Sequence, residues 1–292
     1  MNVKWLLERD IFDEDLLPIL MAIKDQGFEY RIVTYIPFES GEFDQFAEDE
    51  CVFCYGSLNL MKQLKEKKKW VPGPIINLPN FECTLYYTYL GKYLLNKDYM
   101  MMPLAEMQRR GREIAEIFGG DSFFVRPSSG FKPFTGDVLT VDDWDSQMEW
   151  IDNFTRKDEM VVVSSPKTVT VEYRFIVSDK KVLTGSRYGT GREGSLCKKE
   201  FNQCVQDWEP TNIETVNPQE ALKLAQVVAA EKWEPDRMYV IDIGESDGKM
   251  HLMEINSLSA SGWYACDPQI VVAEASKVAW EEWENKKLTC ST

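Results

Sequence analysis

Three oxygen-bearing side chains near the C-terminal end of the chain have the types and spacing of a divalent-metal site. Residues 239–256 form an apolar run containing Asp242, then a turn, then a second run that ends with Glu254 and Asn256. Burying charged groups in strands is costly unless a cation offsets the cost. Hard oxygen ligands suit Mg²⁺ held together with nucleotide phosphates better than zinc or copper. The pattern therefore predicts phosphate chemistry.

The turn between the two runs decides whether these side chains meet. Because strand side chains alternate between faces, a three-residue loop at 246–248 places Asp242, Glu254 and Asn256 on one face of the sheet. A four-residue loop would break this arrangement. The single histidine, His251, precedes Glu254 by three positions, so we expect it on the opposite face. This placement argues against histidine triads and His-rich zinc sites.

Two cations lie close together in a segment in the middle of the chain. Within residues 123–136, Arg126 ends a strand-like run and Lys132 lies in a loop rich in Gly, Ser and Pro. The forked donors of arginine and the mobile charge of lysine could clamp polyphosphate oxygens, with backbone amides of the loop helping. The alternative is a surface loop with incidental charges, and the spacing by itself does not separate the two.

A third group of charges lies on an alternating strand at residues 171–177. The alternation places Glu172, Arg174 and Ile176 on one face and the apolar and aromatic residues on the other. Arg187, on the following strand, could add positive charge to the face of Arg174. The alternative is that Glu172 and Arg174 pair across the sheet surface, which contributes little.

The elements that must position these residues form an α/β pattern followed by an α+β pattern. Strand-like and helix-like runs alternate over residues 1–95, which predicts a small α/β unit with a parallel sheet. Further along, helical patterns alternate with paired strands and the acidic hairpin. The predicted elements are strands at 3–7, 30–35, 51–55, 122–126 and 160–166, two long strands between 168 and 188, and helices at 13–26, 58–69, 104–118 and 217–232.

Composition narrows the class of protein. The 292 residues carry a formal net charge of −15, which disfavours a nucleic-acid partner, although a local basic pocket can still bind ATP. Charges interrupt the first apolar run too early for a secretory signal, and no apolar segment has membrane-spanning length, so we expect no membrane partner and a cytosolic protein. The cysteines number seven, and the close pair Cys51 and Cys54 points to opposite faces of a strand, which favours buried thiols over a metal or disulfide site.

The order of these motifs resembles the ATP-grasp superfamily. The resemblance is closest to a clade, frequent in phages and bacteria, in which arginine replaces the usual first lysine, and it covers roughly residues 120–270. A phage-encoded chain would act in the host cytoplasm. The matching motifs are Phe-Val-Arg-Pro at 124–127, Lys-Pro-Phe-Thr-Gly at 132–136, Val-Glu-Tyr-Arg-Phe at 171–175, Ser-Arg-Tyr at 186–188, Val-Ile-Asp-Ile at 240–243 and Met-Glu-Ile-Asn at 253–256.

The resemblance implies a fold, a set of ligands and a role for each motif. A pre-ATP-grasp α/β domain at 1–95 would precede an ATP-grasp domain at 96–292, whose two α+β subdomains, about 96–165 and 166–292, grip Mg-ATP between them. The implied roles are metal ligation by Asp242, Glu254 and Asn256, phosphate binding by Arg126, a mobile loop carrying Lys132, ribose binding by Glu172, and an adenine hinge near Val163 and Ser164.

One departure from the family pattern concerns a catalytic charge. The family's usual arginine two residues before the first aspartate is here Val240, so Arg174 or Arg187 must supply that charge if the enzyme is active. The resemblance implies an ATP-dependent carboxylate–amine ligase that joins a small-molecule, peptide or protein-tail carboxylate to an amine through an acylphosphate. Residues 261–264 follow the metal motif and could shape the acceptor pocket, or be core aromatics. Two other functions remain open: a non-catalytic ATP-binding module that switches a protein interaction, and phosphotransfer to a hydroxyl.

Overall fold

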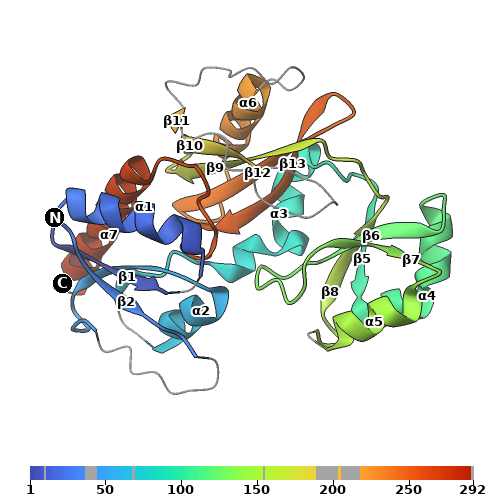
Figure 1. Ribbon diagram of the computed structural model, residues 1–292, viewed down its shortest axis with the longest axis horizontal. Coiled ribbons are helices and arrows are strands. Elements are labelled where there is room, and N and C mark those ends of the chain that lie inside the picture. Colours follow the sequence, from blue (N-terminus) through green and yellow to red (C-terminus); the bar gives the residue numbers. More distant parts are fainter. Residues whose placement is uncertain are drawn as a thin grey trace.

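The computed structural model describes residues 1–9, 11–36, 45–67, 70–153, 155–188, 203–204 and 218–290, which fold around three sheets (Figure 1). The first sheet is parallel, with the strand order β2-β1-β3-β4, as the sequence predicted. Its central strand β3 is buried at every position, which explains its continuous apolar run. The strands are β1 (Val3–Glu8), β2 (Glu29–Val33), β3 (Cys51–Tyr55) and β4 (Val71–Gly73).

Helices cover both faces of the first sheet. Helix α2 (Leu58–Lys67) packs on one face, and α1 (Asp13–Asp25) packs on the other together with the last helix, α7 (Pro268–Cys290). Figure 1 shows α7 beside α1, and the indole of Trp5 in β1 donates to the hydroxyl of Ser276 in α7 at 3.1 Å. The α/β unit expected at 1–95 is therefore completed by the far end of the chain. No described helix has both the length and the apolar character needed to cross a bilayer.

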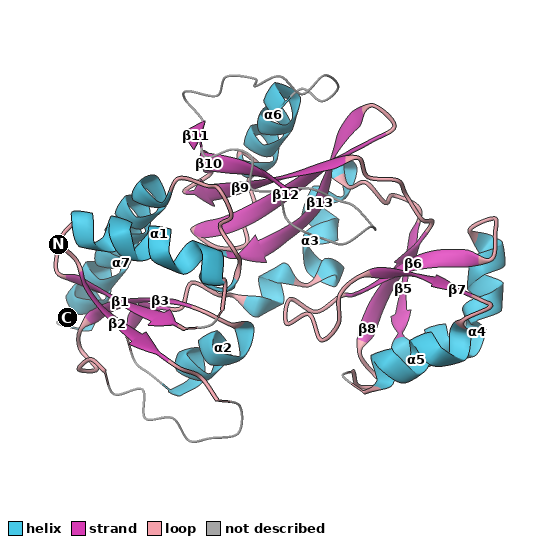
Figure 2. Cartoon of the chain, in the orientation of Figure 1, coloured by secondary structure: helices cyan, strands magenta, loops and turns pink. Residues whose placement is uncertain are grey.

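The second sheet is antiparallel and lies apart from the first (Figure 2). Its strand order is β5-β8-β6-β7, and two helices pack on one face to enclose a separate apolar core. The elements are β5 (Tyr99–Pro103), α4 (Leu104–Ile117), β6 (Ser122–Pro127), β7 (Asp137–Thr140), α5 (Trp144–Asp152) and β8 (Met160–Ser164). This sheet carries Arg126 at the end of β6.

The third sheet carries the acidic hairpin. Its strands run antiparallel in the order β11-β10-β9-β12-β13, and the alternation predicted for β9 is confirmed, since its apolar and aromatic side chains enter the core beneath α3 and α6. The opposite face holds Arg174 and Asp242. The elements are α3 (Cys83–Leu90), β9 (Val171–Ser178), β10 (Lys181–Tyr188), β11 (Gln203–Cys204), α6 (Pro218–Ala229), β12 (Met238–Ser246) and β13 (Lys249–Ser257), with short 3₁₀ turns at Leu78–Phe81, Gly91–Tyr93 and Leu258–Ala260.

The hairpin turn has two residues, not the three expected from the sequence. Asp247 and Gly248 both have positive φ, 50° and 73°, as a type I′ turn requires. A β-bulge at Met253 then shifts the register by one residue, so that Asp242 faces Glu254. The same bulge places His251 opposite Gly244, on the face of Asp242. The expectation that His251 lies on the other face was therefore wrong.

Candidate functional site

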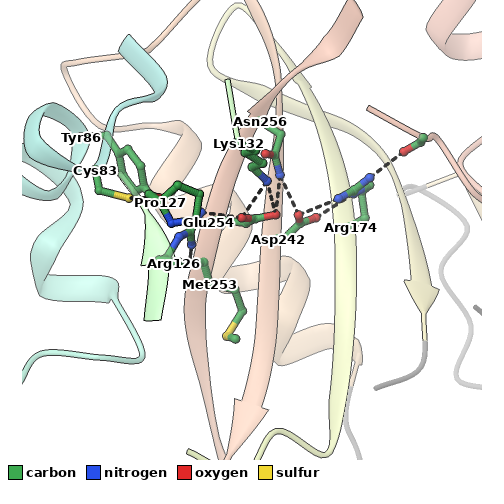
Figure 3. Close-up of polar contacts among 11 residues, drawn as sticks. Cys83, Tyr86, Arg126, Pro127, Lys132, Arg174, Asp242, Met253, Glu254 and Asn256 are labelled. Atoms are coloured by element: carbon green, nitrogen blue, oxygen red, sulfur yellow. Dashed lines mark hydrogen bonds and ion pairs between the residues drawn. The ribbon is translucent and has the colours of Figure 1, made fainter. Parts of the chain in front are cut away.

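The three predicted oxygen-bearing side chains converge on one face of the third sheet (Figure 3). The Asn256 amide nitrogen donates to Asp242 Oδ2 at 3.0 Å and to Glu254 Oε1 at 2.8 Å. Asp242 has no solvent exposure, and Asn256 is buried. The hairpin register, through the bulge at Met253, thus gathers two carboxylates and one amide in a single cluster.

Arg174 is the cation that partners Asp242. It lies directly opposite Asp242 on the neighbouring strand β9, and its Nε and Nη2 donate to the two carboxylate oxygens at 2.8 Å each. Its Nη1 donates to the carbonyl oxygen of Gly262 at 2.9 Å. Burial raises the pKa of Asp242, and the Arg174 guanidinium opposes that rise. Such a forked geometry fixes the orientation of both groups.

Two further cations hold Glu254 from the second sheet and its loop. Arg126 Nη2 donates to Oε2 at 2.7 Å, and Lys132 Nζ lies 2.9 Å from both carboxylate oxygens. Burial by itself raises the pKa of Glu254, but the Lys132 ammonium and the Arg126 guanidinium outweigh it and hold that pKa well below its usual range. The carboxylate is therefore ionised and bridges the second and third sheets.

The loop that carries Lys132 is folded down over this cluster. Lys132 has a positive φ of 49°, and its backbone N–H donates to the Ser129 carbonyl at 3.1 Å. Gly130 packs so closely that a Cβ there would lie 2.9 Å from both the Leu78 carbonyl oxygen and the Phe81 Cβ. Only glycine fits this approach, so the Gly/Ser composition of the loop has a steric reason.

A cavity of about 460 Å³ opens beside the cluster, between the second and third sheets. Arg126, Lys132 and Glu254 line it, and so does Glu172 from the start of β9. Asn96 also lines it, and the buried Asn96 Oδ1 and Arg126 Nε have no hydrogen-bond partner among the described residues. Buried polar atoms without partners are uncommon and mark places where a polar ligand can bind. Cations lie at one end of the cavity, as an anionic ligand requires.

The remaining predicted residues are placed less simply. Val163 is buried in β8 between β5 and β6, and Ser164 follows it; neither lines the cavity, whereas Lys167 and Val169, just after β8, do. Arg187 pairs with Tyr173 on β9, so strand alternation directs its side chain to the face opposite Arg174. The structure therefore does not bring Arg187 to the cluster, contrary to the expectation that it shares the face of Arg174.

Sequence reasoning missed several cavity residues because they come from distant connections. Asn96 lies between the first and second sheets, and Tyr87 belongs to α3. Lys167 forms an ion pair with Asp98 at 3.5 Å. None of these residues belongs to a motif of fixed spacing, so no local signal identified them.

The donor set of the cluster fits a hard divalent cation that keeps other ligands of its own. No group of three or more His, Cys, Asp or Glu side chains able to hold a metal occurs among the described residues. The cluster instead offers two carboxylates and the amide of Asn256, which presents its oxygen after a simple flip. Mg²⁺ is commonly held by one or two carboxylates while water and phosphate oxygens complete its shell. The residues thus fit Mg²⁺ accompanied by phosphates.

Comparisons with known proteins agree with this arrangement. The model of one family of ATP-grasp domains matches residues 110–273. Among solved structures, D-cycloserine synthetase DcsG is 13% identical with a TM-score of 0.61, over 96% of this chain and 99% of that one. A D-alanine–D-alanine ligase from Bacillus anthracis is 12% identical with a TM-score of 0.58, over 98% and 99%. The ATP-grasp ligase PsnB, complexed with a minimal precursor, is 14% identical with a TM-score of 0.52, over 96% and 99%. No curated protein matches the sequence.

Proposed function

Because the chain belongs to the ATP-grasp family, we propose that it is an ATP-dependent carboxylate–amine ligase. A substrate carboxylate attacks the γ-phosphorus of ATP, which releases ADP and leaves an acylphosphate. An amine then attacks the acyl carbon, phosphate leaves, and a C–N bond forms. The solved ligases of the same fold support this reaction class, as the names of D-alanine–D-alanine ligase and of the ligase PsnB indicate.

The observation that carries the proposal is the pair of cations on Glu254 at the mouth of the larger cavity. Arg126 and Lys132 reach this carboxylate from a different sheet and line the cavity with it. On nucleotide binding they would exchange the carboxylate for phosphate oxygens, for which a guanidinium fork and a mobile ammonium are suited. Fixed cations around a transferring phosphoryl group stabilise the charge that develops on it.

Asp242, Glu254 and Asn256 are the proposed ligands of Mg²⁺, which would neutralise phosphate charge when bound. Glu172, which lines the cavity, is the proposed ribose-binding carboxylate. The adenine-binding segment, expected near Val163 and Ser164, is better proposed at 167–169, where side chains reach the cavity wall.

Arg174 is the proposed replacement for the arginine that Val240 lacks. Arg174 and Val240 lie on adjacent strands, and the Arg174 guanidinium is fixed beside Asp242 by two hydrogen bonds of 2.8 Å. In this position it would stabilise the acylphosphate next to the metal ligands. The register of Arg187 gives no such support, so we propose Arg174 alone for this role.

Hydroxylamine provides a test that needs no knowledge of the natural amine. An acylphosphate formed from an added carboxylic acid is trapped as a hydroxamate, with ADP and phosphate released in equal amounts. We expect ATP-dependent hydroxamate from the wild-type protein and a loss of at least about 100-fold in Glu254→Gln, because one metal ligand and the partner of two cations are removed. Glu274→Gln, which removes a surface carboxylate paired with Lys277, is the matched control. Mg-ATP binding without ADP formation with any acid would support the non-catalytic alternative instead.

A further inference from the structure

A second, smaller cavity of about 160 Å³ adjoins the metal-ligand cluster. Lys132 lines both this cavity and the larger one, and Asn256 lines the smaller one as well. The two spaces therefore meet at the residues proposed to bind phosphate and metal. A molecule in the smaller cavity would lie next to the γ-phosphate end of a nucleotide in the larger one.

Positive charge defines one side of the smaller cavity. Lys132 and Arg174 line it, and the Arg174 guanidinium carbon lies 4.7 Å from the centre of the Tyr264 ring. None of the described residues lining this cavity is an Asp or a Glu. A bound group that faces this side is therefore anionic.

Apolar residues from the first part of the chain form the rest of the wall. Phe12 precedes α1, Leu58 opens α2 and Phe81 ends the 3₁₀ turn at Leu78–Phe81. A cavity of about 150 Å³ holds one benzene ring, so this one suits a substituent of similar size. A compact apolar group would be favoured here over a second charge, which the wall could not solvate.

The loop that forms the cavity floor is held in place by the α/β unit. Asp15 of α1 accepts the Trp263 N–H at 2.7 Å, and the Tyr55 hydroxyl donates to the Ser261 carbonyl at 3.0 Å. Phe12 and Tyr264 both have positive φ, 51° and 53°, which is unusual for aromatic residues and is found where a site fixes the backbone. Trp263 is core, as one of the two sequence interpretations allowed, whereas Tyr264 faces the cavity.

From this arrangement we infer that the smaller cavity binds the carboxylate substrate, and that this substrate is a free, compact monocarboxylic acid bearing one apolar or aromatic group. Its carboxylate faces Lys132 and Arg174, and its substituent packs against Phe12, Leu58 and Phe81. The α/β unit thus selects the acid. This inference rests on the proposed ligase function, because it assigns one of the substrates of that reaction.

The first test compares acids in the hydroxamate assay with ATP and Mg²⁺. Benzoate and isovalerate represent compact apolar acids, succinate carries a second carboxylate, and trialanine represents a peptide C-terminus. We expect kcat/KM to be at least about tenfold higher for benzoate or isovalerate than for the other two, which corresponds to about 1.4 kcal/mol. A preference for succinate would overturn the apolar assignment, and a preference for trialanine would overturn the free acid.

The second test alters the wall without touching the larger cavity. Ala260 lines the smaller cavity only, so Ala260→Leu should reduce acid-dependent hydroxamate at least tenfold while the Kd of a non-hydrolysable ATP analogue changes less than twofold. Leu58→Ala widens the wall and should shift the preference towards 2-naphthoate, which keeps the test decisive if Ala260→Leu does not fold.

The failure of this inference differs from the failure of the proposed function. If the wild-type protein forms no ADP with any acid, the ligase proposal is wrong. If ADP and hydroxamate form, but neither wall variant changes the rate or the preference, the ligase stands and the acid binds elsewhere.

Discussion

Asp242 lies directly opposite Glu254 across the hairpin, although the two-residue turn by itself would place Asp242 opposite Met253. The bulge at Met253 makes up the difference and keeps both carboxylates on one face. The arrangement therefore depends on the turn and the bulge together.

The turn gives a stability prediction with a built-in control. Gly248 has a φ of 73° in open space, so Gly248→Ala should destabilise the protein by about 1 kcal/mol through backbone strain. Gly91 also lies in open space but has a helical φ of −54°, so Gly91→Ala should be neutral or stabilising by up to about 1 kcal/mol. Urea unfolding measures both. Equal losses in the two variants would contradict the assigned turn geometry.

The buried pair of Arg174 and Asp242 gives a second prediction. Arg174→Met leaves a fully buried carboxylate without its cation, so we expect a loss of about 3–5 kcal/mol in the free energy of unfolding. Arg237→Met, which removes a more exposed partner of Asp179, should cost only about 0–1 kcal/mol. Chemical denaturation at neutral pH separates these values. A loss below about 1 kcal/mol for Arg174→Met would show that the pair does not form as described.

Arg126→Lys tests whether fork geometry, rather than charge alone, serves the proposed nucleotide site. Arg126 donates to both Glu254 and the Met253 carbonyl, the latter at 3.3 Å, and an ammonium cannot reproduce that planar spacing. We expect kcat/KM for ATP to fall about tenfold, the equivalent of one charge-assisted hydrogen bond. Arg109→Lys, at an exposed arginine paired with Glu106, is the control and should have no effect. Unchanged kinetics in Arg126→Lys would mean that charge alone suffices.

The single histidine provides a pH prediction. Burial, assisted by the charges of Lys97 and Lys249, lowers the pKa of His251 below 6.5 in the folded protein. Because the unfolded chain then binds the proton more tightly, stability should decline as pH falls through 6.5 and level off below the folded pKa. NMR titration of the one imidazole gives its pKa directly, and His251→Gln should remove this part of the pH dependence. A measured pKa above 6.5 would contradict the described environment.

The sequence predicted what depends on local pattern and missed what depends on contacts between distant segments. The parallel first sheet and the alternation of β9 follow from apolar periodicity, and the types of Asp242, Glu254 and Asn256 indicated their clustering. The bulge at Met253 has no composition signal, so the turn length and the face of His251 were predicted wrongly. The face of Arg187 depends on its pairing with Tyr173, which only the sheet register determines.

The position of α7 has a consequence for how the protein forms during translation. Trp5, Val3 and Leu7 of β1 share their core with Val271 and Ala275 of α7. A nascent chain emerges from its N-terminus and segments normally fold in that order. Here the first strand to leave the ribosome must wait with an uncovered apolar face until residues 268–290 have been synthesised, so its final burial is a post-translational event.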